Sequence, residues 1–288
     1  MPDIWHLAAP PWEGDLFVAG EFERTAHVWS LGRRTPVAVV DTVFDPGGRR
    51  LALVTGDTPV VVAGAWARHG VCGYSLTGEP LWEDRTQSHV QDVTALAHGR
   101  VAVGHARGPA RVLDGSTGAE VRSLRGVSGV HALTPTVSLL ESSAHYRLAD
   151  TELEPLGRRI ELRSFAVLAA AASAEHVAVA EAGGPLRILD LDGTERAAYA
   201  VPGGHVVSVA HDRATGTWRA VTRVERQDEV DHRHVRLSDD GEVLDEHPLG
   251  DVFDATWLRD GGALVLSSGI GLVVLDGHTK DARLLATP

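Results

Sequence analysis

A short pattern recurs along the chain near the end of one expected strand in each unit: Trp, Tyr or Leu followed by Ser, Asp or Ala. The copies end at Ser30, Ser75, Asp114, Ala149, Asp190, Ser238 and Asp276. The six steps between them average 41 residues, so seven units nearly fill the 288-residue chain. A repeat of about 40–45 residues with four strands per unit is typical of a β-propeller blade. We therefore predict an all-β fold in which residues 1–288 form one domain, a single seven-bladed β-propeller with four antiparallel strands per blade.

The stretch Val60–Trp82 shows the unit in detail. It contains a β-branched run at Val60–Ala63, a second strand at Val71–Leu76 and the start of a third at Leu81–Trp82. The turn at Thr77–Glu79 depends on glycine, which takes positive φ without steric cost. Three short strands cannot bury their apolar faces alone, so this unit needs the neighbours that the repeat supplies.

Two further expectations follow from the strand pattern. The Ala-rich run Leu168–Ala174 has some helical character, but it falls where the fifth blade needs its inner strand, near Ala166–Ala170. An inner strand near Ile4–Ala8 and an outer strand near Ala282–Leu285 complete the first and last blades. We therefore expect the ring to close by packing of the seventh blade on the first.

Several segments resemble bacterial WD40 and PQQ-like repeat propellers. Val112–Gly118 is similar to the PQQ-type pattern Ala-x-Asp-x-x-Thr-Gly, and Tyr74–Trp82 to its Thr-Gly-x-x-x-Trp end. Val43–Ala52 is similar to the WD40 approach to the second strand. The resemblance covers the whole chain as a repeat type and implies an architecture rather than one function. Quinone dehydrogenases of this class carry a vicinal cysteine pair, and the single Cys72 cannot supply one, so we expect no cofactor.

Composition narrows the classes of partner and compartment. The chain has 27 Lys and Arg against 39 Asp and Glu, a net charge of −12, which argues against nucleic acid as a partner. No apolar run approaches the roughly 18 residues of a membrane helix, so we expect no membrane. The start of the chain lacks the basic region and apolar core of a signal peptide. We therefore predict a cytoplasmic protein with Cys72 buried in a strand.

The candidate binding face lies where the loops between second and third strands meet the connections between blades. Loops at one end of a propeller vary without disturbing the blades, and Trp and Arg dominate binding hot spots. The residues expected to form the contact patch, from the second and third blades, are Trp66, Arg68, His69, His105 and Arg107. Further residues expected on this face are Glu21, His89, Glu141, Glu181 and His205. For each residue a purely structural role remains open, including Trp66 as the end of a buried strand.

Two other arrangements of ionisable residues could form a site near the central channel. Five ionisable residues occupy equivalent positions at the ends of the second strands: Glu21, His105, Glu141, Glu181 and Arg223. They either form a ring around the channel mouth or cap the strand ends and pair with a neighbouring arginine, as Glu181 could with Arg163. Histidines near the starts of inner strands could converge on the channel: His6, His89, His131 and His205. The segment Asp231–His234 is read as a charged hairpin tip rather than a metal site, so no metal is predicted.

The sequence contains no Gly-x-Ser-x-Gly elbow, phosphate loop, His-Glu-x-x-His motif or Cys-x-x-Cys motif. We therefore predict a non-catalytic binding module, a scaffold or regulator with a protein partner. The alternative is an enzyme, a lyase or hydrolase with a His/Glu site at the mouth of the central channel, with or without a metal. A small ligand at that mouth and the neutralisation of a partner such as a toxin are further alternatives.

Overall fold

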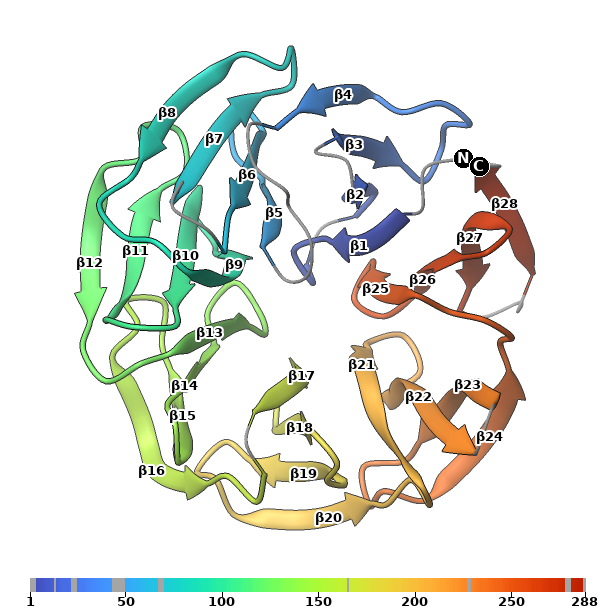
Figure 1. The fold of residues 1–288 in the computed structure, drawn as a ribbon. Coiled ribbons are helices and arrows are strands. Elements are labelled where there is room, and N and C mark those ends of the chain that lie inside the picture. The colour runs from blue at the N-terminus through green and yellow to red at the C-terminus, as the bar shows by residue number, and fades with distance from the viewer. Residues whose placement is uncertain are drawn as a thin grey trace.

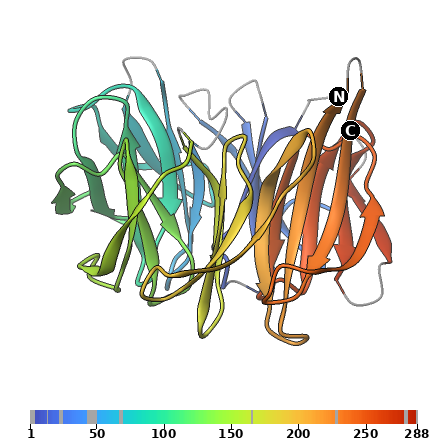
Figure 2. The same ribbon diagram turned by 90° about the horizontal axis from the view of Figure 1, so that it is seen from below.

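A computed structural model describes residues 4–12, 14–21, 25–42, 50–66, 70–164, 166–226, 229–277 and 281–286. They form seven four-stranded antiparallel sheets arranged as the blades of a β-propeller, with no helix in these ranges (Figure 1). The prediction of seven blades with four antiparallel strands each is confirmed. The strands run across the thickness of a disc, so the loops gather on its two faces (Figure 2).

The strand bounds of the first four blades are these. Blade 1 comprises β1 (Ile4–Ala8), β2 (Leu16–Glu21), β3 (Thr25–Ser30) and β4 (Ala38–Asp41). Blade 2 comprises β5 (Leu51–Val54), β6 (Val60–Gly64), β7 (Val71–Ser75) and β8 (Pro80–Asp84). Blade 3 comprises β9 (Val90–Ala95), β10 (Arg100–His105), β11 (Ala110–Asp114) and β12 (Glu120–Leu124). Blade 4 comprises β13 (Gly129–Ala132), β14 (Ser138–Glu141), β15 (His145–Ala149) and β16 (Pro155–Glu161).

The remaining three blades complete the ring. Blade 5 comprises β17 (Val167–Ala172), β18 (His176–Glu181), β19 (Leu186–Asp190) and β20 (Glu195–Tyr199). Blade 6 comprises β21 (Gly204–Asp212), β22 (Thr217–Arg226), β23 (Glu229–Leu237) and β24 (Val243–Pro248). Blade 7 comprises β25 (Asp254–Leu258), β26 (Ala263–Ser268), β27 (Gly271–Asp276) and β28 (Ala282–Ala286). The Ala-rich run of blade 5 is a strand, as expected, because tertiary pairing outweighs the helix propensity of alanine.

In every blade the strands follow sequence order from the centre to the rim (Figure 1). In five blades the pairing of the third and fourth strands shifts register at the start of the recurring pattern used to find the repeat. The shifts lie at Gly73/Tyr74, Val112/Leu113, Tyr146/Leu148, Ile188/Leu189 and Arg236/Leu237. Such an irregularity adds local twist, which the outermost strand needs in order to follow the curve of its blade.

Apolar packing between neighbouring blades forms the core. The ring closes in this way at the junction of blades 7 and 1, where Leu7 and Phe17 pack in one cluster with Leu258 and Val265. No strand is exchanged there, because β1–β4 belong to blade 1 and β25–β28 to blade 7. The Leu7 N–H donates to the Asp254 carboxylate at 2.7 Å, which adds a polar link across the closure.

Trp82 on β8 links blade 2 to blade 3. Its indole N–H donates to the carbonyl of Gly115 at 2.8 Å. Its ring leaves no room for a side chain at Gly73 or Gly118, where a Cβ atom would lie 2.4 and 2.5 Å from the indole. The tryptophan and the glycines of the PQQ-like segments therefore meet across a blade junction.

We expect Gly118→Ala to destabilise the protein more than Gly99→Ala. Both glycines have positive φ, 70° and 67°, but only at Gly118 does the new Cβ collide with Trp82; nothing lies within 4 Å of it at Gly99. The difference in the free energy of unfolding should be about 1–3 kcal/mol, the usual range for overpacking. Urea unfolding of both variants measures it, and equal losses would show that Trp82 does not hold this junction.

Candidate functional site

The described residues that were predicted to bind come from loops and strand ends at one face of the disc, here called the upper face. It carries the turns between second and third strands and the connections from blade to blade. Glu21 ends β2, but its side chain lies outside the described part of the chain, as do Arg68 and His69. Trp66, His89 and Arg107 are described and are contributed by the facing loops of blades 2 and 3.

Trp66 is half exposed, at 50% of its possible surface, yet it has a defined neighbour. Its ring meets the His89 ring edge-on, with centroids 5.5 Å apart at 88°. His89 has a φ of 60° and accepts a hydrogen bond at its carbonyl from Ala106 N–H at 3.0 Å. Ser88 Oγ lies 2.8 Å from His89 Nδ1. An exposed tryptophan is thus supported by a histidine that the junction of blades 2 and 3 holds in place.

Two exposed arginines lie in loops of blade 3 on the same face, and the turn that holds the first is joined to His89 through the Ala106 N–H. Arg107 lies in the turn after β10, and Arg125 follows β12. The two loops are joined through the hydrogen bond from Ala110 N–H to the Val127 carbonyl at 3.0 Å. Neither arginine takes part in an ion pair among the described residues. We call Trp66, His89, Arg107 and Arg125 the Trp66 patch; the sequence places Arg125 in a loop of this face but not in the predicted contact patch.

His105, expected in the contact patch, is buried beneath it. Burial lowers the pKa of its imidazole, and nearby Arg111 acts in the same direction. Arg111 itself forms an ion pair with Asp84 of blade 2 and a 2.7 Å pair with Glu120 of its own blade. His105 therefore supports the surface from below and presents no area to a partner.

Glu181, also expected on the face, is fully buried in blade 5. Its carboxylate accepts a 2.8 Å hydrogen bond from the Arg187 guanidinium and a 2.6 Å bond from the backbone N–H of Arg163. The Arg163 side chain instead pairs with Glu195 at 2.8 Å, so the suggested side-chain pair with Glu181 is wrong. Arg187 also donates to the Tyr146 hydroxyl at 3.0 Å, which ties blade 5 to blade 4.

Glu141 has a comparable linking role between blades 4 and 5. One carboxylate oxygen lies 2.8 Å from His131 Nε2, and the other accepts the backbone N–H of Val167 at 2.9 Å. Because His105 and Glu181 are buried and Glu141 is nearly so, the aligned ends of the second strands do not form a uniform exposed ring. The structure supports the strand-capping interpretation at Glu141 and Glu181.

The central channel has a volume of about 1070 Å³ and is lined by residues of all seven inner strands. Its walls are mostly small and apolar, and His6, His131 and Asp254 are among the polar residues that line it. His6 Nδ1 lies 2.9 Å from Asp254 at the junction of blades 1 and 7, and His131 pairs with Glu141 on blade 4. Sequence analysis missed Asp254, since only ring closure brings it to His6.

The four histidines expected near the channel separate into two groups. His6 and His131 line it, whereas His89 belongs to the Trp66 patch and His205 lies outside the channel lining. Burial lowers the pKa of His205, with Arg223 acting in the same direction. His232 of the predicted hairpin tip is buried within the long strand β23. In the ranges given above, no group of three or more His, Cys, Asp or Glu could hold a metal ion.

Comparison with known proteins identifies the fold alone. No family model matches the chain, and no curated protein matches it. The crystal structure of the computationally designed Ika8 protein is similar, with a TM-score of 0.63 and 18% identity over 98% of this chain and 86% of the other. The WD40 or PQQ-like repeat type therefore stays a prediction. The described residues include no helix long and apolar enough to cross a membrane.

We expect the protein to lose stability as the pH falls through about 6.5, the ordinary pKa of histidine. Burial lowers the pKa of His105, His205, His211 and His232 in the folded state. The unfolded chain then binds more protons than the folded one, so the stability present above that pH is lost below it.

Urea unfolding on both sides of about pH 6.5 measures this dependence. His105→Gln removes one of the titrating groups and should flatten the curve relative to the unchanged protein. An identical pH dependence in the variant would contradict the assignment of a lowered pKa to His105.

Proposed function

We propose that this propeller is a non-catalytic binding module, a scaffold or regulator that engages a protein partner through the Trp66 patch. The observation that carries the proposal is the half-exposed Trp66 ring, held edge-on against His89 at the junction of blades 2 and 3. Large exposed aromatic side chains on a rigid support are typical of binding hot spots. Because the patch is held before binding, little conformational entropy is lost on association. The same proposal places the protein in the cytoplasm.

The charge of the patch suggests the chemistry of the partner. Arg107 and Arg125 are exposed cations on a protein of net charge −12. Their charge favours a partner with acidic residues beside an apolar contact for Trp66, because complementary potentials speed association and fix register. The rest of the acidic surface would repel such a partner and restrict it to the patch.

Trp66→Ala should abolish recovery of the partner when the protein is used for affinity capture from a lysate of the source organism. With the captured protein purified, calorimetry should show binding weakened by about 2 kcal/mol or more, the loss typical of a hot-spot residue. Arg107→Ala should weaken binding less and reduce its salt dependence, because a rim charge acts mainly on the association rate.

Leu81→Ala is the matched control. Leu81 is also about half exposed, at 45%, but it lies on the outer strand β8 rather than in an upper-face loop. It should leave binding unchanged. A partner that binds the Trp66→Ala variant as tightly as the unchanged protein would overturn the proposed surface.

The channel supports a second candidate function, an enzyme with an acid–base site. His6 and Asp254 form an imidazole–carboxylate pair in the wall of a channel large enough for a small ligand. His131 lines the same channel and pairs with Glu141, which lies outside the lining. A carboxylate that holds an imidazole in place is a common arrangement for general acid–base catalysis, including hydrolysis and elimination.

Screening the purified protein for hydrolase and lyase activity tests this candidate. His131→Asn should lower any such activity by about 100-fold, the contribution of one general acid or base. Trp66→Ala, outside the channel, should not affect it. Activity that is absent, or equal in His131→Asn, would remove the enzyme candidate and leave the binding module.

A further inference from the structure

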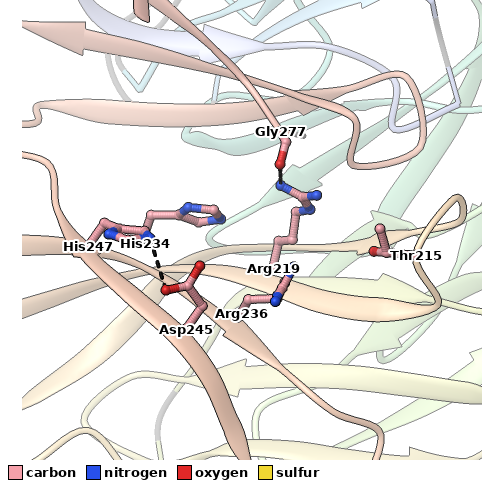
Figure 3. A pocket seen from close by; sticks show the side chains of 7 residues that line it. All are labelled: Thr215, Arg219, His234, Arg236, Asp245, His247 and Gly277. Atoms are coloured by element: carbon pink, nitrogen blue, oxygen red, sulfur yellow. Dashed lines mark hydrogen bonds and ion pairs between the residues drawn. The ribbon is translucent and has the colours of Figure 1, made fainter. Parts of the chain in front are cut away.

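A second, smaller cavity lies away from both the channel and the Trp66 patch, between blades 6 and 7. It has a volume of about 130 Å³, which admits several water molecules or one small ligand. Its walls come from β22, β23 and β24 and from Gly277 after β27 (Figure 3). The side chains that meet there are strongly polar, which sets the cavity apart from the apolar blade junctions.

Arg219 forms one fixed wall of this cavity. It is buried and donates through Nε and Nη2 to the Asp212 carboxylate at 3.0 and 2.5 Å. Its Nη1 donates to the Gly277 carbonyl across the blade junction (Figure 3). The lowered pKa of Asp212, to which Thr215 and Arg219 contribute against the effect of burial, keeps that carboxylate ionised. Arg219 is thus rigid, and its charge is offset by Asp212.

Arg236 is the second arginine of the cavity, and within the described ranges its positive charge is not offset by an ion pair of the kind that Arg219 makes with Asp212. It lies on β23 beside the cavity, and it takes part in no ion pair among the described residues. Its Nε is shielded from solvent and has no hydrogen-bond acceptor in that part of the chain. A buried guanidinium N–H without an acceptor is unfavourable, so a group that supplies one from within the cavity would be stabilised.

Asp245, the acidic residue that lines the cavity, is paired with a histidine rather than with Arg236. Asp245 on β24 faces Arg236 in the strand register, but its carboxylate pairs with His247 at 2.9 Å (Figure 3). The His234 ring, 5.7 Å from Trp257 of blade 7, adds a further imidazole to the wall. A guanidinium, two imidazoles and a fixed second guanidinium therefore surround a space of ligand size.

We propose that this cavity is a binding site for a small oxyanion, a carboxylate or a phosphate. Guanidinium groups recognise such oxygens through paired N–H donors, and both ligand classes share that chemistry. The bound anion would join β23 of blade 6 to the Gly277 turn of blade 7 through Arg236 and Arg219.

Calorimetric titration with inorganic phosphate, sulfate and acetate tests the proposal. We expect saturable binding of one anion per chain by at least one probe, and the preferred probe identifies the source of the oxyanion. Arg236→Gln should weaken that binding at least tenfold. Asp245→Asn should tighten it, because the variant removes the negative charge of the cavity wall. This second variant keeps the test decisive if Arg236→Gln does not fold.

Arg233→Gln is the matched control on the same strand. Arg233 is already paired with Asp231 at 2.7 Å and with Glu246 at 3.1 Å, and it does not line the cavity. Its loss should leave anion binding unchanged. No binding of any probe at millimolar concentration, or equal weakening by Arg233→Gln and Arg236→Gln, would overturn the proposal.

Discussion

The burial of each sheet face against the next blade is the constraint on which this structure depends. A four-stranded sheet with two apolar faces is stable only if both are covered, and a ring provides a neighbour on each side of every blade. The clusters that combine Leu7 with Leu258, or Ala52 with Val101, show this pairing at two junctions. Because the ring closes without strand exchange, side-chain packing joins its two ends, and the hydrogen bond from the Leu7 N–H to Asp254 adds a polar link.

Polar residues at the junctions add specific contacts between neighbouring blades to this apolar packing. Arg111 and Arg187 occupy equivalent places on the third strands of blades 3 and 5, and each reaches a residue of the preceding blade, Asp84 or Tyr146. Arg219 does the same toward blade 7 through Gly277. Breaking a buried ion pair of this kind leaves an uncompensated charge, so the Arg111–Asp84 pair is costly to separate.

The candidate binding surfaces lie at the same blade junctions. The Trp66 patch exists because blades 2 and 3 bring their loops together, and the imidazole–carboxylate pair of His6 and Asp254 exists because the ring closes. The small cavity near Arg236 lies at a third junction, where the side chains of blade 6 do not fill the space before Gly277. Sites in this protein are therefore properties of blade pairs rather than of single blades.

The architecture could be predicted from the sequence, because strand periodicity and turn residues are local and the repeat spacing is read directly along the chain. The sequence predicted the seven blades, a strand near Ala166–Ala170 where the structure has β17 (Val167–Ala172), and a loop position for Trp66. The exposure of each polar residue, in contrast, depends on how the blades pack. Glu181 and His105 look like surface residues in the sequence but are buried by a neighbouring blade, and Arg125 joins the patch through a loop contact. Such contacts join distant residues, as His6 meets Asp254, and no local pattern encodes them.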